Sequence, residues 1–280
     1  MVRPVVPGCR TSGVGPGRGW AKDGLHHLPR TAGGALEVGL VVVRRAALAV
    51  IAPVVVAVGV VVGAPTAGSA PPAQSPVDIT PSVLRFDPTA PALGISYHHS
   101  AADVAYVQRD GDCAARGGEE TEQATPVAGA GYVTYRGKRY DLAQFHFHTP
   151  SEHTFEGRHD PLEMHLVHKA ADGETLVIGV PLRVGTPSAV DGVLARLTPE
   201  CGAAQHIDDV DLAALLPTVH PTARYTGSLT TAPYTEGVLW FLMPEQHVTA
   251  ASISRFQQLF PVGNARPTQP LNGRTVTVHQ

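Results

Sequence analysis

The stretch QFHFHTPSEH at residues 144–153 places three histidines and a glutamate in a segment whose apolar residues alternate as in a β-strand. Side chains two positions apart on a strand point to the same face of a sheet. Gln144, His146 and His148 are therefore expected to share one face. The stretch predicts a sheet that carries a cluster of titratable groups on one side.

A second segment, PLEMHLVHK at 161–169, has the same spacing and places Glu163 and His165 on one face of a later strand. If the two strands are neighbours, three imidazoles converge. Three histidine ligands with an open fourth position are typical of a catalytic zinc site, whereas structural zinc sites usually have four protein ligands rich in cysteine. The sequence contains no CxxC motif.

Each histidine ligand also needs a partner that fixes the orientation of its ring. Gln144 beside His146, and Glu163 beside His165, are placed for that role. The alternative is a set of hydrogen-bonded core histidines, which is the simpler explanation for any one of them. Three histidines with matched partners favour the metal site.

The same spacing fits a second kind of metal site. The motif His146-x-His148-xxx-Glu152, with His165 downstream, resembles the metal motif of cupins, in which the glutamate is itself a ligand. The residues before the last histidine, DPLEM, differ from the cupin pattern of Gly and Pro, so this match is partial.

The composition favours a mainly β (α+β) protein, because the 280 residues include 29 Gly and 25 Pro, and short runs rich in Val, Thr and Tyr. The folding part, 71–280, is long enough for one substantial core and is expected to form a single domain. A net charge of −3 with scattered cations argues against a nucleic-acid partner.

The N-terminal region differs from the rest of the chain. From Arg44-Arg45, a basic pair precedes an apolar run and a small-residue end at Gly68-Ser69-Ala70, which is typical of a secretory signal peptide at 44–70. The alternative is an uncleaved membrane anchor at 46–63, which would give the protein a membrane partner. Residues 1–43 are then a disordered tail or a leader from a mis-assigned start codon. We expect an exported protein: extracellular, periplasmic or at the cell surface.

Three cysteines are present, and Cys9 belongs to the leader. An exported chain with Cys113 and Cys201 remaining suggests one disulfide between them. The alternative is two unpaired thiols.

The pattern of apolar and turn residues predicts a large twisted sheet, mostly antiparallel, with a few short surface helices. The polar stretch at 108–125 is expected to be an exposed loop or irregular edge. The expected strands are 83–86, 94–98, 131–135, 140–148, the first part of 162–173, 175–185 and the end of 224–244; the expected helices are 188–197, 209–216 and 252–260.

Five ordered segments together resemble the alpha-class carbonic anhydrases. They are QSPVDI near residue 75, QFHFHTPSEH, PLEMHLVHK, GSLTTAP with Trp240 beyond it, and NARPTQPLNGR at 264–274. The resemblance covers nearly all of 74–280. It implies one domain around a large, mostly antiparallel sheet, and a zinc lyase, carbonate dehydratase, that hydrates carbon dioxide to bicarbonate and a proton.

The resemblance also implies roles for single residues. His146, His148 and His165 become the Zn²⁺ ligands, Gln144 and Glu163 their hydrogen-bond partners. Glu152 then accepts a hydrogen bond from Thr230, whose oxygen accepts one from the zinc-bound hydroxide that attacks carbon dioxide. The apolar wall of the substrate pocket corresponds to Val167, Val177, Leu229, Val238 and Trp240, and Thr231 contacts bicarbonate. By contrast, His153 and His168 are interpreted as structural.

The sequence departs from the family where a histidine usually relays protons to solvent. A loose alignment puts Asp110 there, and an exposed carboxylate with a pKa near 4 is a poor acceptor for a proton from water of pKa about 7. The proton shuttle is therefore not assigned, with His98 or His99 as alternatives, and turnover is expected to be limited by proton transfer. Ala232-Pro233, where a Pro-Pro pair is common, is a candidate cis bond. A different function class is a catalytically silent surface binding module, whose members typically lose a zinc ligand.

Overall fold

The structure is a computed structural model that describes residues 71–108, 120–219 and 221–279. All described residues belong to one compact unit of the chain.

Some sequence-based assignments lie outside the described residues. These are the leader at 1–43, the signal segment at 44–70, Asp110, and Cys113 of the expected disulfide. The domain boundaries and the disulfide therefore stay predictions.

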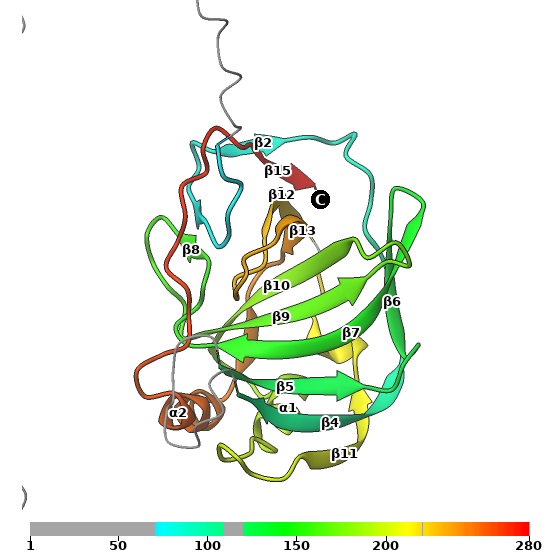
Figure 1. Ribbon diagram of the computed structural model, residues 1–280, viewed down its shortest axis with the longest axis vertical. Coiled ribbons are helices and arrows are strands. Elements are labelled where there is room, and N and C mark those ends of the chain that lie inside the picture. Colours follow the sequence, from blue (N-terminus) through cyan, green and yellow to red (C-terminus); the bar gives the residue numbers. More distant parts are fainter. Residues whose placement is uncertain (1–70, 109–119, 220, 280) are drawn as a thin grey trace, which may run out of the picture. The chain divides into compact units, whose positions relative to one another are not determined.

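Most of the described strands join one large twisted sheet, in which the neighbours run β11-β4-β5-β7-β9-β10-β13-β12-β15-β2 (Figure 1). Three further strands attach to it: β14 pairs with β10, β6 with β7, and β3 with β6. The strands are β1 (Asp78–Ile79), β2 (Leu84–Phe86), β3 (Gly94–Tyr97), β4 (His99–Val107), β5 (Thr121–Pro126), β6 (Gly131–Tyr135), β7 (Lys138–His148), β8 (Thr154–Phe155), β9 (Leu162–Lys169), β10 (Thr175–Val184), β11 (Gln205–Asp211), β12 (Thr222–Ser228), β13 (Glu236–Leu242), β14 (Gln246–Val248) and β15 (Val276–His279).

Most pairings are antiparallel, and the parallel ones are β10 with β13 and β14, β15 with β2, and β1 with β8. The prediction of a mainly β, mostly antiparallel fold is confirmed. The central strands β9 and β10 are buried over nearly their whole length, so both faces of the sheet are covered there, and the nearly continuous apolar sequence of β10 agrees with this.

The two faces of the sheet carry separate apolar clusters. The larger contains Phe147, Ile178 and Phe241, together with the buried apolar residues of α1 (Ala189–Leu194) and α2 (Ala250–Leu259). The smaller contains Val167, Val177 and Trp240 from the opposite face. Because successive residues of one strand enter different clusters, the sheet separates two environments.

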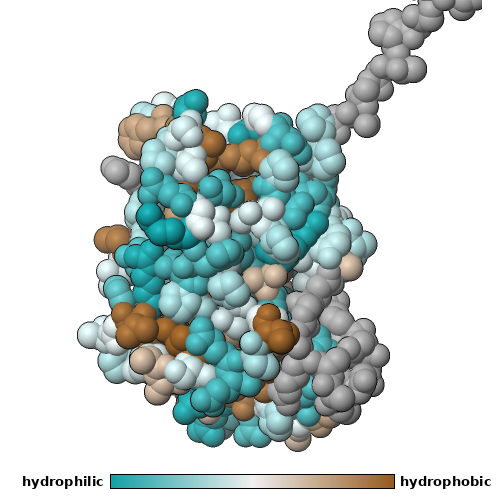
Figure 2. Space-filling model, turned by 90° about the vertical axis from the view of Figure 1, so that its left-hand side faces the viewer, coloured by the Kyte–Doolittle hydropathy of each residue, from teal (hydrophilic) through white to brown (hydrophobic). Residues whose placement is uncertain are grey.

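Helix α2 is amphipathic and begins at Thr249, whose hydroxyl accepts a hydrogen bond from the backbone N–H of Ser252. The carboxylate of Asp191 in α1 accepts hydrogen bonds from the hydroxyls of both residues, so the two short helices are joined at their N-termini. None of the helices among the described residues is long and apolar enough to cross a membrane. The face of the molecule in Figure 2 is mainly hydrophilic, with a few separate hydrophobic patches.

Three local predictions are wrong. Within 108–125, residues from Thr121 onward form β5 and not a loop, and Glu122 is fully buried. The helix expected at 209–216 is reduced to the short 3₁₀ turn Ala213–Leu215, because the preceding residues pair with β4 as β11. Finally, the loop expected before β13 is the strand β12.

Candidate metal centre

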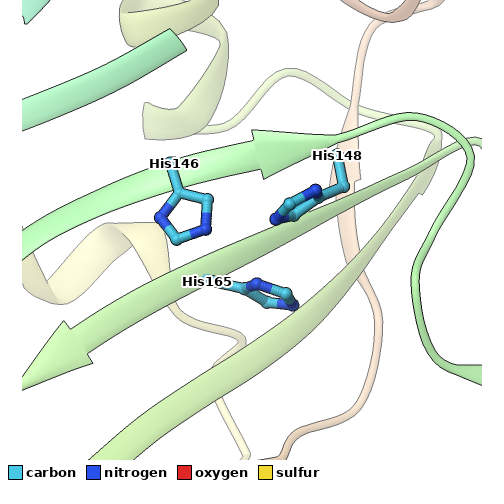
Figure 3. Close-up of side chains that lie close together, drawn as sticks. All are labelled: His146, His148 and His165. Carbon is cyan, nitrogen blue, oxygen red and sulfur yellow. The ribbon is translucent and has the colours of Figure 1, made fainter. Parts of the chain in front are cut away.

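Three histidine rings converge on one face of the sheet, where β7 and β9 pair (Figure 3). His146 lies directly opposite His165 in the antiparallel register, and His148 is two residues further along β7. The ring centroids are 4.6–5.2 Å apart, and one ring nitrogen from each residue lies within 4.8 Å of the others. The expected convergence is present, and it follows from the period of the strands and their register.

Each of the three rings makes a hydrogen bond through its other nitrogen. His146 Nδ1 lies 2.8 Å from Gln144 Oε1, and His165 Nε2 lies 2.8 Å from Glu163 Oε1. His148 Nδ1 lies 3.2 Å from the backbone carbonyl oxygen of Asn264. The atoms left to face one another are therefore Nε2 of the two β7 histidines and Nδ1 of the β9 histidine.

One of these facing atoms, His148 Nε2, is buried without a hydrogen-bond partner among the described residues. A buried polar atom without a partner is costly unless something else satisfies it. A metal ion bound by three imidazoles would do so, and it would use the free electron pair of each ring nitrogen. The residues present therefore fit a three-histidine metal site.

The electrostatics keep two of these rings, His148 and His165, neutral. Burial lowers the pKa of His148 to about 4, and burial also lowers the pKa of His165 despite the nearby carboxylate of Glu163. A neutral imidazole at physiological pH is the form that binds metal.

Glu163 belongs to a buried network behind the cluster. Its Oε1 lies 2.7 Å from His153 Nδ1, and His153 Nε2 lies 2.7 Å from the hydroxyl oxygen of Tyr225. Burial alone would raise the pKa of Glu163, but His153 and His165 outweigh it and hold that pKa well below its ordinary value. Because the facing nitrogens already make these hydrogen bonds, the group of His153, Glu163 and His165 is a positioning network and not a second metal site.

Glu152 lies next to the cluster and is 1% exposed. Its Oε1 accepts a hydrogen bond of 2.9 Å from the backbone N–H of Arg266, and its Oε2 lies 3.8 Å from His165 Nδ1. Burial raises the pKa of Glu152 to about 7, against the opposing influence of His165, Arg266 and the Thr230 hydroxyl. The expected partners Glu152 and Thr230 are thus brought together beside the ring nitrogens.

A cavity of about 210 Å³ opens onto the histidines. Its lining includes five of the six residues expected at the pocket, namely Val167, Val177, Leu229, Thr231 and Trp240, as well as Thr230. The sixth, Val238, is not among the lining residues and packs in the apolar cluster behind them. The wall is therefore apolar, with hydroxyl groups close to the metal ligands.

The chain matches the family model for eukaryotic-type carbonic anhydrases over residues 65–280. A carbonic anhydrase from Neisseria gonorrhoeae is 34% identical over 205 residues, which are 72% of this chain and 76% of the relative. The chain belongs to the carbonic anhydrase family. A carbonic anhydrase from Nostoc sp. is 40% identical over 149 residues, and that match covers 52% of this chain and only 56% of the relative.

Solved structures agree with this assignment. The alpha-carbonic anhydrase from Thermovibrio ammonificans, in complex with the inhibitor sulfanilamide, has a TM-score of 0.63 and 35% identity, covering 73% of this chain and 86% of that chain. Dioscorin complexed with ascorbate also has a TM-score of 0.63, with 26% identity, and covers 73% and 84% of the two chains. The expected family and fold are confirmed, and the cupin interpretation is wrong.

Sequence reasoning missed several residues of this carbonic anhydrase site. Thr121 and Gln123 line the cavity from β5, the strand that was interpreted as a loop. Asn264, which holds His148, lies in the segment NARPTQPLNGR, whose resemblance to the family was the available signal. His153 and His168 are buried and hydrogen-bonded, as expected of structural histidines, but His153 also touches Glu163.

The alternative proton relays are far from the cavity. Ala105 of β4 lies opposite Gln123 of β5, and Gln123 lies opposite His146 of β7, so Ala105 marks the level of the metal cluster on β4. His99 is six residues further along β4 and is therefore roughly 20 Å away at ~3.3 Å per residue; it pairs with Asp209. Among the described residues that line the cavity, the histidines are the ligand candidates themselves. The expected cis bond at Ala232-Pro233 is confirmed.

Proposed function

We propose that this chain is a zinc enzyme that catalyses the reversible hydration of carbon dioxide to bicarbonate and a proton. The observation that carries the proposal is the convergence of three imidazoles, with His148 Nε2 buried and unpartnered among the described residues, at the end of an apolar cavity. The silent binding module is disfavoured because all three candidate ligands are retained.

Zinc bound by His146, His148 and His165 would lower the pKa of a water molecule from about 15.7 to about 7 and so supply the nucleophile. These values are the general ones for carbonic anhydrase. The three rings donate hydrogen bonds to Gln144 Oε1, Glu163 Oε1 and the Asn264 carbonyl oxygen, which fixes the orientation and tautomer of each ring.

Glu152 and Thr230 orient the reacting oxygen in this proposal. The carboxylate is held by the backbone N–H of Arg266, and its second oxygen is buried without a hydrogen-bond partner among the described residues. That oxygen can accept a hydrogen bond from the Thr230 hydroxyl. The threonine oxygen then presents its lone pairs to the nucleophile, which it holds in one orientation.

The apolar wall binds the substrate. Carbon dioxide is uncharged and gains little from a polar site, whereas Val167, Val177 and Leu229 exclude water beside the reacting oxygen. Thr231 lies at the same cavity and contacts the charged product.

Proton transfer to solvent limits turnover in this proposal. Of the described lining residues, Lys169 is a titratable group that is not a candidate ligand, and its Nζ donates a hydrogen bond of 2.6 Å to Thr175. An ammonium group has N–H donors and no acceptor, so it cannot take up the proton that leaves the reacting water.

We further propose that the chain is exported and carries a disulfide between Cys113 and Cys201. The support is the basic pair, the apolar run and the small-residue end within 44–70, together with the two cysteines beyond them. Intact-mass analysis of the exported protein is expected to find an N-terminus near Ala70 and a mass that increases on reduction. A full-length chain retained in membranes would favour the anchor instead.

The catalytic proposal is tested by metal removal. Treatment with a chelator should abolish hydration of carbon dioxide, and added Zn²⁺ should restore it, whereas Mg²⁺, which prefers oxygen ligands, should not. Zinc binding without hydration would favour the binding module.

A further inference from the structure

A charged residue lies buried on the other face of the sheet from the histidines. In β12 and β13, Tyr225 pairs with Trp240, and both belong to the smaller cluster on the metal face, so Arg224 and its partner Phe241 face the opposite side. Arg224 is only 7% exposed. A buried guanidinium keeps its charge, because its ordinary pKa is above 12.

The partners of Arg224 do not neutralise this charge. Its Nε donates a hydrogen bond of 2.6 Å to Thr222 Oγ1, its Nη1 donates to the backbone carbonyl of Pro91, and the Tyr135 side chain is also close. Among the described residues, no carboxylate oxygen lies within 4.0 Å of its guanidinium nitrogens. A buried charge without a counter-ion is costly.

The guanidinium borders a second cavity. This cavity has a volume of about 240 Å³ and lies between the turn that joins β6 to β7 and the strands β12, β13 and β15, which run side by side in the upper part of Figure 1. Its lining includes Tyr135, Arg136 and Arg224, as well as Asp87, Thr275 and Thr277.

A second arginine reaches the same cavity from the turn. Arg136 Cζ lies 5.1 Å from the centroid of the Tyr135 ring, and Arg224 Cζ lies 5.8 Å from the same centroid. The nearby carboxylate of Asp87 is already hydrogen-bonded by the backbone N–H and hydroxyl of Thr89, and it forms no ion pair with either arginine among the described residues. The lining therefore carries more positive than negative charge.

The turn itself is an unusual place for an arginine. Arg136 and Gly137 form a two-residue hairpin in which both φ angles are positive, at 52° and 75°. Such hairpins favour Asn-Gly and Gly-Gly, because L-residues with larger side chains are strained at positive φ. The strain is explained if the side chain at this position has a role of its own.

We propose that this cavity binds a small oxyanion through Arg224 and Arg136, with the Tyr135 hydroxyl as a further contact. A guanidinium group offers parallel N–H donors that match the oxygens of bicarbonate or phosphate, and burial strengthens such charge-assisted hydrogen bonds. Trp240 borders both cavities, but Arg224 faces away from the metal centre and neither arginine lines the metal cavity, so the two sites are distinct. It goes beyond the proposed hydration reaction and does not depend on it.

The competing explanation is a purely structural arginine. Arg224 Cζ lies 4.9 Å from the centroid of Phe241, so the aromatic ring already offsets part of the buried charge. This stacking uses the face of the guanidinium and not its edge, where the N–H groups are. A guanidinium has five N–H donors, so those not used by Thr222 and Pro91 can reach an anion in the cavity that Arg224 borders.

The test measures binding of inorganic phosphate and, separately, of bicarbonate to the full chain carrying His146→Ala, which prevents anion binding at a metal. Isothermal titration is expected to give saturable binding that weakens as sodium chloride is added. The affinity for the anion should fall at least about tenfold when Arg136→Asn is combined with His146→Ala, which is the loss expected for a hydrogen bond to a charged group. Because Asn suits the turn, this variant should keep the thermal stability of the parent.

Matched variants complete the test. Arg158→Gln removes a similarly charged group that pairs with Glu156 on the surface, and it should leave the affinity unchanged. Arg136→Lys should retain part of the binding, and Arg224→Gln should lose it if circular dichroism shows a folded chain. Absence of saturable binding to either anion, or equal affinity in Arg136→Asn and its parent, would overturn the proposal.

Discussion

The two faces of the sheet accommodate buried basic groups in opposite ways. On one face, the rings of His148 and His165 are buried, and burial lowers their pKa so that they are neutral at pH 7. On the other face, burial also lowers the pKa of Arg224, but a guanidinium remains charged across the physiological range. One face thus offers electron pairs to a cation, and the other offers a charge to an anion.

The difference shows that the side chain, and not burial alone, decides what a buried basic group can bind. The histidines have acceptors on their outer nitrogens, which direct the inner nitrogens at one another. Arg224 has neutral acceptors and aromatic neighbours, which leave its charge unbalanced. Variants on the two faces should therefore affect different measurements.

Among variants that keep all three ligand candidates, the largest effect is expected at Thr230. Thr230→Val removes the hydroxyl beside Glu152 while keeping the volume, and hydration should fall about 10²–10³-fold, as for the loss of one preorganised hydrogen-bond group. Zinc content should not change, because the ligands are intact. Stopped-flow hydration and metal analysis check both expectations, and an unchanged rate would remove Thr230 from the mechanism.

Acid should destabilise the metal-free protein as pH falls from about 6.5 to 4. His148 and His168 have a pKa of about 4 in the folded chain against an ordinary value of 6.5, so the unfolded chain binds protons at a higher pH. This preference lowers the free energy of unfolding by about 3 kcal/mol for each histidine. The pKa of Glu152 is raised to about 7 from 4.5, so the folded chain binds this proton first, which offsets about the contribution of one histidine. The free energy of unfolding should therefore fall by about 3 kcal/mol between pH 6.5 and 4.

Urea unfolding of the chelated chain at several pH values measures this loss. The lowered pKa values of Glu163 and His165 act in the same direction as the two histidines. A free energy of unfolding that stayed constant or rose between pH 6.5 and 4 would contradict the electrostatic account of the histidine face.

Zinc affinity should depend on the partners of the ligands. Gln144→Ala removes the acceptor of His146 Nδ1, and affinity should fall about 10–100-fold. Gln123→Ala is the matched control, because it shortens a glutamine at the same cavity that hydrogen-bonds Thr125 instead of a ligand. Competition with a chromophoric chelator measures the zinc affinity of both variants. If both lost the same affinity, the effect would come from the cavity wall and not from the hydrogen bond to His146.

The smallest effect is expected from buffer. If the cavity lacks an efficient relay, added imidazole buffer accepts the proton in place of a side chain. The hydration rate should then rise by roughly an order of magnitude at most. A rate independent of buffer concentration would point to a relay within the chain.

The sheet centre and the metal cluster were predictable because their signals are local. The strict spacing of Gln144, His146 and His148 fixes their common face, and Glu163 with His165 repeats it on the next strand. Only the pairing of β7 with β9 was needed to bring the two sets together.

The remaining parts depend on partners far away in the sequence. Glu120 and Glu122 made β5 resemble a loop, yet each carboxylate accepts a hydrogen bond within the fold, from the Tyr106 hydroxyl and the backbone N–H of Thr198. Strand β11 exists because it pairs with β4, about a hundred residues earlier along the chain. The acceptor of His148 is a backbone carbonyl, and such a group leaves no signal in the side-chain pattern.

The most direct test of the account measures zinc content and carbon dioxide hydration together in the wild-type chain, His146→Ala and Arg136→Asn. The account predicts one tightly bound zinc and rapid hydration in the wild type, loss of both in His146→Ala, and no change in Arg136→Asn, which alters only the opposite face. Hydration that survives in His146→Ala, or a zinc-loaded wild type without hydration, would contradict it.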